Sequence, residues 1–195
     1  MSFNTTEINR LIRTRRSVYP PQYSGEPVPD EVVHEMLENA NWAPTHGLTE
    51  PWRFVVFKGD GIKKLATFQS ELYKEKSTAA GSFDETKFKK LANKPLLASH
   101  IISIGMKREL KQRFPEVEEV EAVACAVQNM YLTATAHQVG CYWGSGGVTY
   151  DEEAKSFFGL GEHDRLLGFL YLGMPKGDWP QGRRRPVADK VKWVQ

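Results

Sequence analysis

The segment from Glu116 to Gln138 constrains the fold more than any other part of this 195-residue chain. Acidic residues begin it and Gly140 follows it, a pattern that predicts one long helix. Its middle, AVACAVQNMYLTATA, is small or apolar on nearly every side. A helix of that composition must be buried on most of its faces. We therefore expect a central helix, surrounded by other elements and packed against its copy in a dimer.

Three apolar runs predict buried strands around that helix. They are Trp52 to Phe57, Leu96 to Met106, and Leu166 to Gly173. Segments with helical periodicity separate them, at uneven lengths. That pattern favours an α+β layer architecture over strict βαβ repetition. Because no repeat or linker interrupts the chain, we expect residues 1–195 to form a single domain.

Composition excludes several classes of protein. Twenty-six basic residues against 24 acidic ones give a net charge of +2, which does not predict a nucleic-acid partner. The polar start MSFNTTEINR does not resemble a signal peptide, and no apolar segment approaches the roughly 20 residues that span a bilayer. Cys125 and Cys141 form no metal-binding pattern, and reduced thiols are the simplest interpretation. We expect a cytoplasmic protein with no membrane partner.

Positive charge is concentrated in two short clusters near the ends of the chain. Residues 13–17 read RTRRS, and residues 182–185 read GRRR. The first cluster has a structural explanation, because cations stabilise the C-terminal end of a helix. It also suits a phosphate, since each guanidinium can pair with two oxygens. If the fold brings the clusters together, they would form a site for a doubly charged phosphate.

Two further segments suit a flat ligand. Residues 42–57, WAPTHGLTEPWRFVVF, form a loop shaped by proline and glycine that carries Trp42 and His46. Residues 140–147, GCYWGSGG, place two aromatic residues beside small ones, without the spacing of a dinucleotide-binding turn. A turn with core tryptophans and a tight turn after the long helix are the alternative interpretations. We also expect residues 77–85 to form a mobile loop that lies over a site.

Taken in order, these motifs resemble the nitroreductase-like family of flavoenzymes. The motifs are Arg15-Arg16-Ser17, Ala43-Pro44, Pro51-Trp52-Arg53-Phe54, Trp143-Gly144-Ser145, Gly168 to Gly173, and the arginine run before Pro186. The resemblance rests on their shared order and spacing over nearly the whole chain. It implies a mostly antiparallel sheet flanked by helices, in a homodimer with exchanged C-terminal segments. Two FMN molecules would sit at the dimer interface.

The resemblance assigns the two basic clusters to the cofactor. Arg15, Arg16 and Ser17 would bind the ribityl phosphate and the edge of the ring. Arg183 and Arg185 would complete the phosphate clamp.

The same resemblance assigns the aromatic segments to the isoalloxazine ring of FMN. Trp143, Gly144 and Ser145 would pack against the ring, and Trp42 and His46 would reach it from the other subunit. No metal site is implied, and the histidines show no metal-binding spacing.

Three positions depart from the family pattern. Tyr19 stands where many members have a basic residue near N1 and O2 of the flavin, Glu50 stands where glutamine is common, and His46 replaces a small residue. These features resemble the compact branch of candidate NAD(P)H nitroreductases. They leave FMN binding intact and the substrate open.

The activity implied by the resemblance is ping-pong hydride transfer from NAD(P)H to a small electron-poor acceptor, such as a nitroaromatic or a quinone. The cofactor carries this chemistry, so no side chain is assigned as an obligatory catalytic residue. His46 would contact FMN or donate a proton near the ring. Two alternatives stay open: a flavin-binding protein with a different redox role, and a small nucleic-acid-binding module that uses the basic clusters.

Overall fold

The computed structural model describes residues 2–195. The helices are α1 Thr5–Thr14, α2 Asp30–Asn41, α3 Asp60–Ala79, α4 Glu85–Asn93 and α5 Glu116–Ala136. The strands are β1 Trp52–Lys58, β2 His100–Met106, β3 Gly140–Gly144 and β4 Arg165–Gly173. Short 3-10 turns are η1 Pro20–Gln22, η2 His46–Leu48, η3 Lys94–Leu97, η4 Glu152–Phe158 and η5 Val187–Lys190.

The four strands form one antiparallel sheet in the order β1-β2-β4-β3. Trp52 pairs with Met106 at one end of the β1–β2 ladder, and Gly140 pairs with Gly173 in the β3–β4 ladder. At the β3 edge, Ser17 makes a parallel bridge to Cys141, so the segment after α1 extends the sheet. The expectation of an α+β fold with a mostly antiparallel sheet is confirmed.

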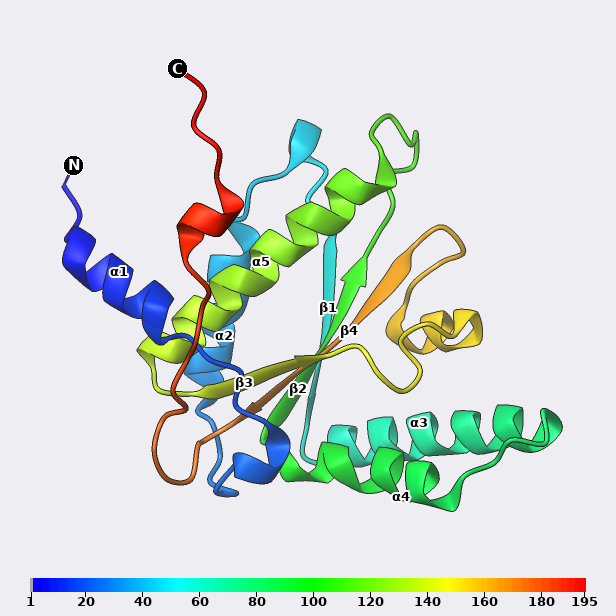
Figure 1. Ribbon diagram of the computed structural model, residues 1–195. Helices are drawn as coiled ribbons and strands as arrows, with labels where there is room; N and C mark the ends of the chain where they lie inside the picture. The colour runs from blue at the N-terminus through cyan, green and yellow to red at the C-terminus, as the bar shows by residue number, and fades with distance from the viewer. Residues whose placement is uncertain (1) are drawn as a thin grey trace.

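Successive side chains of each strand point to opposite faces of the sheet, and this divides the core into two layers. Ile102 and Ile104 of β2 pack in one cluster with α2 and α5, whereas Ile101 packs in the other with α3 and η4. Figure 1 shows α5 crossing the sheet on one side, and α3 with α4 lying on the other.

The long helix α5 is buried along the face that meets the sheet and α2. Ala126, Met130 and Ala134 are fully buried in that core. Ala124 and Cys125, in the same apolar run, are exposed on the opposite face. Packing within one chain therefore covers only part of the apolar surface that the sequence places on this helix.

Two local interpretations differ from the structure. Residues 77–79 belong to α3, where Ser77 is buried, and Glu85 begins α4, so the loop expected over residues 77–85 is limited to residues 80–84. Residues 140–144 form β3, so the alternative interpretation of a tight turn there is wrong. At the start of α2, Pro29 occupies the N-cap, and the Asp30 carboxylate pairs with Lys58 and His100.

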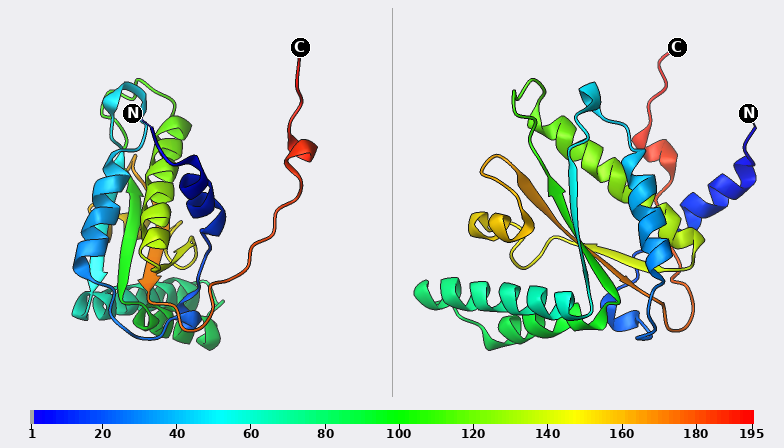
Figure 2. Two further views of the ribbon diagram at one scale, coloured as in Figure 1. Left: turned by 90° about the vertical axis from the view of Figure 1, so that its left-hand side faces the viewer. Right: turned by 180° about the vertical axis from the view of Figure 1, so that it is seen from behind.

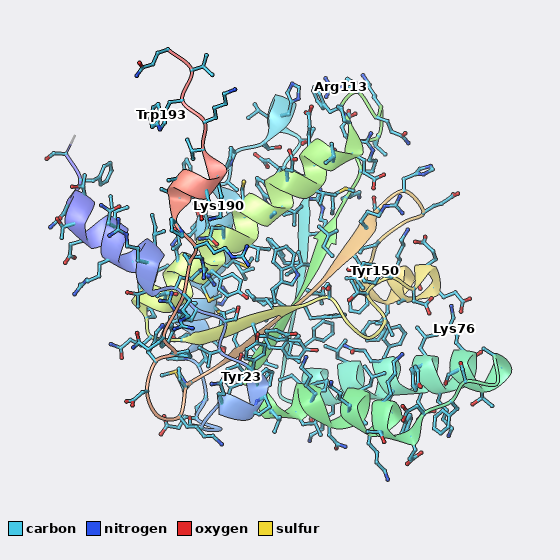
Figure 3. All side chains as sticks on the ribbon, viewed as in Figure 1. Tyr23, Lys76, Arg113, Tyr150, Lys190 and Trp193 are labelled. Carbon is cyan, nitrogen blue, oxygen red and sulfur yellow. The ribbon has the colours of Figure 1, made fainter. Side chains whose placement is uncertain are left out.

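The two ends of the chain extend away from this body. Helix α1 has no buried residue, and residues 181–195 are exposed along their whole length (Figure 2). Figure 3 shows Lys190 and Trp193 on this tail, well separated from Lys76 at the other end of the molecule, and Trp193 is 86% exposed. Within residues 2–195, no helix is both long enough and apolar enough to cross a membrane.

Candidate functional site

The fold brings the N-terminal and C-terminal basic clusters together beside β3. The Nη1 atom of Arg16 donates to the carbonyls of Arg13 (2.6 Å) and Arg15 (2.7 Å), which fixes the guanidinium. Gly182 lies against it so closely that a Cβ added there would be 2.2 Å from Arg16 Cζ. The indole of Trp179 donates to the carbonyl of Thr14 (2.7 Å) and fastens the start of the tail to the end of α1. A phosphate-sized group at this junction would meet both clusters.

Charge at the junction is not neutralised within the chain. Arg10, Arg108, Arg113 and Arg165 each pair with a glutamate. Within residues 2–195, by contrast, no ion pair forms at any of the following arginines: Arg13, Arg15, Arg16, Arg183, Arg184 and Arg185. The buried Nε of Arg16 also has no hydrogen-bond partner in the described chain. A buried guanidinium N–H without an acceptor is costly, and an anion would satisfy it.

Arg183 and Arg185 are less enclosed than Arg16. Both are exposed on the tail, and Arg183 follows the glycine that touches Arg16. A shallow hollow is formed by Gly182 and the three arginines that follow it. The structure thus brings Arg183 to the junction through its neighbour, and it shows no contact of Arg185 with the N-terminal cluster.

Tyr131 of α5 links the first cluster to the aromatic segment of β3. The Arg15 guanidinium lies 5.2 Å from the centroid of the Tyr131 ring. The Tyr131 hydroxyl accepts from the backbone N–H of Trp143 (2.6 Å). Burial raises the pKa of Tyr131, so this phenol stays protonated near neutral pH.

Trp143 is held in one orientation at the β3 edge. Its indole N–H donates to the carbonyl of Leu167 (2.9 Å), and Gly168 approaches the indole closely at a φ of 122°. Gly144 ends the strand, and Ser145 begins an exposed loop. Trp143, the first of these three predicted ring-contacting residues, is therefore connected to Arg15 through Tyr131.

A pocket of about 310 Å³ opens on the other side of β3, between that strand, α3 and α4. It is lined by Gly144, Gly146 and Gly147, by the rings of Tyr142 and Tyr171, and by Lys94. The buried amide nitrogen of Gln69, which also lines it, has no partner among residues 2–195.

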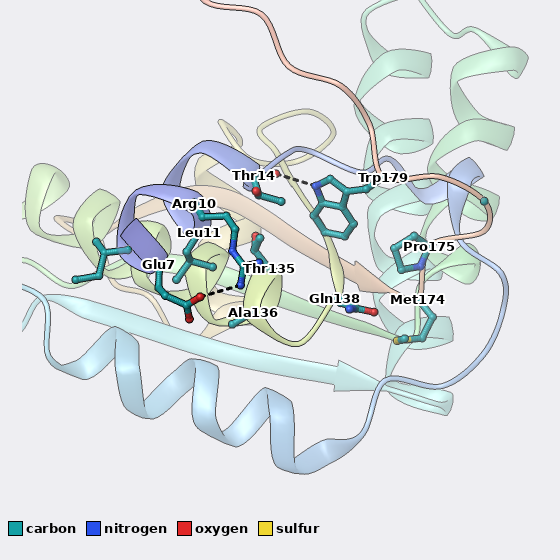
Figure 4. A pocket seen from close by; sticks show the side chains of 12 residues that line it. Glu7, Arg10, Leu11, Thr14, Thr135, Ala136, Gln138, Met174, Pro175 and Trp179 are labelled. Carbon is teal, nitrogen blue, oxygen red and sulfur yellow. Dashed lines mark hydrogen bonds and ion pairs between the residues drawn. The ribbon is translucent and has the colours of Figure 1, made fainter. Parts of the chain in front are cut away.

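A larger hollow of about 800 Å³ lies under α1. Figure 4 shows Leu11 and Thr14 of α1 on one side, with Thr135 from the end of α5 and Met174 on the other. Because α1 has no buried residue, this hollow stays open between the helix and the body of the chain.

Within the described chain, His46 lies far from the arginine junction, and Trp42 makes its side-chain hydrogen bond elsewhere. Trp42 ends α2, is 78% exposed, and donates to Glu38. His46 pairs with Glu118 near the start of α5, whereas Tyr131 marks the junction near its end. The rise of the helix between Glu118 and Tyr131 is about 20 Å. A single chain therefore does not unite all ten predicted residues.

The His46 ring is nevertheless held in place. Its Nδ1 is hydrogen-bonded to the Glu118 carboxylate, and its ring packs 4.0 Å, centroid to centroid, from that of Phe114. Both partners come from the start of α5 and the turn before it. This leaves Nε2 as the nitrogen available to a ligand.

Sequence patterns did not single out Tyr131, Lys94 or Gln69 as site residues. Tyr131 lies within the apolar run of the central helix, and the other two lie in segments with ordinary helical composition. Only the packing of α5, α3 and η3 around the sheet brings them to the site. Within the described residues, no group of three or more His, Cys, Asp or Glu side chains could hold a metal ion.

Comparison with known proteins agrees with this geometry. The sequence profile of the Nitroreductase family matches residues 12–174. The candidate NAD(P)H nitroreductase YdjA of Escherichia coli strain K12 is 34% identical over 152 residues, which cover 77% of this chain and 80% of that protein.

Solved structures of nitroreductase-like proteins are also similar to this chain. A nitroreductase-like family protein from Bacillus cereus has a TM-score of 0.80 at 29% identity, and covers 100% of this chain and 99% of that one. A candidate nitroreductase from Desulfovibrio desulfuricans, solved in complex with FMN, has a TM-score of 0.73 at 25% identity, with the same coverage. The chain belongs to the nitroreductase family, a family of oxidoreductases.

Proposed function

We propose that this chain is an FMN-dependent NAD(P)H oxidoreductase that reduces nitroaromatics, quinones or similar electron-poor acceptors. The observation that carries the proposal is the contact of Arg16 with Gly182, which joins the two basic clusters from opposite ends of the chain. The FMN complex of the Desulfovibrio desulfuricans protein supports the choice of cofactor.

The residues present fit the phosphate of FMN. Arg16 offers a buried N–H that has no acceptor within residues 2–195, and Arg183 follows the glycine that touches Arg16, so it would add a second cation. Guanidinium groups bind phosphate oxygens in pairs, and the hydroxyl of Ser17 adds a donor. Gly182 lets the tail backbone reach this position, since any side chain there would displace Arg16.

The ring would occupy the surface beside residues 143–145. When bound, FMN supplies a carrier that takes a hydride from NAD(P)H and passes two electrons to the acceptor. Trp143, fixed by its bond to Leu167, would keep this surface flat. Small residues at 144–147 let a planar ligand approach the backbone.

The complete site would need two copies of the chain. The exposed stripe of α5, with Ala124 and Cys125, is the apolar surface that a second copy would cover. In such a homodimer, Trp42 and His46 of the second copy would approach the ring from the side opposite Trp143. The exposed tail, residues 181–195, would then pack on the partner as an exchanged segment.

Titration of the protein with FMN after removal of bound flavin tests this proposal. Arg16→Met should raise the FMN dissociation constant by tenfold or more, because a charge-assisted hydrogen bond contributes about 1.5–3 kcal/mol. Arg113→Met removes an exposed arginine that pairs with Glu109, and it should leave the constant unchanged. Equal affinity in the wild type and Arg16→Met would contradict the proposed clamp.

A further inference from the structure

The α4 wall of the pocket beside β3 carries positive charge that the chain does not neutralise. Lys87 and Lys90 line this pocket together with the glycines of residues 144–147, and no Asp or Glu lines it within the described residues. Neither lysine forms an ion pair within residues 2–195, whereas Lys89 on the same helix pairs with Glu85 at 3.3 Å. The pocket therefore has a cationic wall without a counter-ion of its own.

The two lysines belong to a stripe along one face of α4. Positions 87, 90 and 94 are separated by three and four residues, which places their side chains on the same face of a helix. Lys94 follows α4 with helical backbone angles, and the N-terminal end of α4 points away from the sheet (Figure 1). At a rise of about 1.5 Å per residue, the stripe extends outward from Lys94 for about 10 Å. It suits an extended ligand with more than one anionic group.

Repulsion within the stripe shows that its charges face one another. Burial lowers the pKa of Lys94, and the positive charge of Lys90 lowers it further. At the outer end, the Lys87 ammonium lies 4.5 Å from the ring centroid of Tyr73, which stabilises a cation without neutralising it. An anion bound along the stripe would therefore relieve repulsion that the chain leaves in place.

The phosphate of FMN does not account for these lysines. In the proposed function, that single phosphate binds at the junction of Arg16 and Gly182. Arg15, beside Arg16, contacts Tyr131 of α5, whereas α4 lies on the opposite side of the sheet from α5 (Figure 1). The anion that the stripe would bind is therefore a different one.

The second phosphorylated ligand of the proposed reaction is the hydride donor. Its nicotinamide must lie within about 3.5 Å of the flavin ring, which the proposed function places beside residues 143–145. The glycines that follow this segment border the pocket that Lys87 and Lys90 line. From that position, the phosphates of the donor can extend along α4.

We propose that Lys87 and Lys90 bind the phosphates of the hydride donor, and that they make NADPH the preferred donor over NADH. The inference rests on the proposed function, since the donor reacts only with FMN in the site. NADH carries a pyrophosphate, and NADPH adds a 2′-phosphate with nearly two further negative charges at neutral pH. Lysine binds phosphate as a point charge, so two ammonium groups one helical turn apart would discriminate between the donors by charge.

The test measures binding of NADP⁺ and NAD⁺ to the FMN-loaded protein by isothermal titration calorimetry. These oxidised forms carry the same phosphates as the donors and cause no turnover. The proteins are the wild type, Lys87→Met, Lys90→Met and the control Lys89→Met, which removes one positive charge of α4 outside the pocket. Circular dichroism verifies folding, and kcat/KM with NADPH and with NADH gives a second readout.

We expect the wild type to bind NADP⁺ more tightly than NAD⁺. Lys87→Met and Lys90→Met should each reduce that preference about fivefold, which is the upper end of what an exposed ion pair contributes. The loss in kcat/KM for NADPH should appear in KM, since the lysines take no part in the hydride transfer. Lys89→Met should keep the wild-type preference, and added salt should weaken it in the wild type.

Two results would overturn the inference and leave the proposed function intact, as long as NADH or NADPH still bleaches the bound flavin. One is a wild type that binds NAD⁺ as tightly as NADP⁺, or more tightly. The other is an unchanged preference in folded Lys87→Met and Lys90→Met, and an unchanged preference in one variant alone would remove that lysine from the subsite. A wild type that takes up no FMN would overturn the proposed function itself.

Discussion

Arg16 and Gly182, from opposite ends of the chain, are in direct contact. The Arg16 guanidinium fills the space that a side chain at position 182 would need. Arg16 is also held by two backbone carbonyls, so its position depends on both its own segment and the tail. The contact explains how two short basic clusters can act as one site in a chain of nearly neutral charge.

Gly182→Ala should disturb this contact without unfolding the protein. The added methyl would force Arg16 to move, so we expect FMN to bind about tenfold more weakly. Because residues 181–195 are exposed, the free energy of unfolding should change by less than about 0.5 kcal/mol. Gly61→Ala, where the nearest atom is 3.9 Å away, is the matched control for FMN titration. Unchanged affinity in Gly182→Ala would show that the contact does not shape the site.

Glu119→Ala should be the most destabilising change at the start of α5. Glu119 is 2% exposed, pairs with the largely buried Arg108, and accepts from the backbone N–H of Glu109 (3.0 Å). Removing it leaves a buried guanidinium unpaired, at a cost of about 3–5 kcal/mol in urea unfolding. The exposed neighbour Glu121 provides the control, and Glu121→Ala should change stability by less than about 0.5 kcal/mol. Similar losses in the two variants would refute this account of the pair.

Asp30 should make the stability of the folded protein depend on pH. Its hydrogen bond with Lys58, and then that with the buried His100, lowers the pKa of the Asp30 carboxyl. In the unfolded chain an aspartate carboxyl has a pKa of about 3.9. When folding lowers that pKa, the ionised carboxyl stabilises the folded protein at pH values above about 3.9, and this contribution is lost as the pH falls through the folded-state pKa.

Thermal unfolding of the wild type and Asp30→Asn at pH 7 and pH 3 tests this expectation. The wild type should have the higher Tm at pH 7, and the difference should shrink at pH 3, which lies below the unfolded-state pKa of the carboxyl. A Tm difference that is the same at both values of pH would rule out ionisation of Asp30 as its source.

Ala124→Arg should separate the two copies in the proposed dimer. Ala124 lies in the exposed apolar stripe of α5, where a long charged side chain would oppose close helix packing. We expect the variant to elute as a monomer in size-exclusion chromatography with light scattering, and to lose FMN. Ala80→Arg, at the exposed end of α3, should keep the wild-type mass. A dimeric Ala124→Arg would place the interface elsewhere.

Elements with a strong internal pattern were predictable from the sequence. The central helix, expected from Glu116 to Gln138, occupies Glu116–Ala136, and the strand expected at Leu166 to Gly173 occupies Arg165–Gly173. In both, burial on several sides leaves a long apolar run that is visible without any tertiary information.

Elements that depend on tertiary contact were not predictable. Strand β3 has only five residues, two of them glycine, and its strand conformation depends on pairing with β4. Residues 77–79, Ser-Thr-Ala, are small and carry no apolar pattern, yet they continue α3, where Ser77 is buried. Lys94 becomes a site residue only through its position over Tyr142 and Tyr171, which lie on two other elements.

The central claim is that this chain binds FMN and that NAD(P)H reduces it there. The most direct measurement is the visible absorption spectrum of the purified protein, loaded with FMN, before and after anaerobic addition of NADPH or NADH. The account predicts flavin bands that co-elute with the protein and bleach on addition of the reductant. A colourless protein that takes up no added FMN would contradict it, and bound flavin that neither reductant bleaches would contradict the proposed NAD(P)H activity.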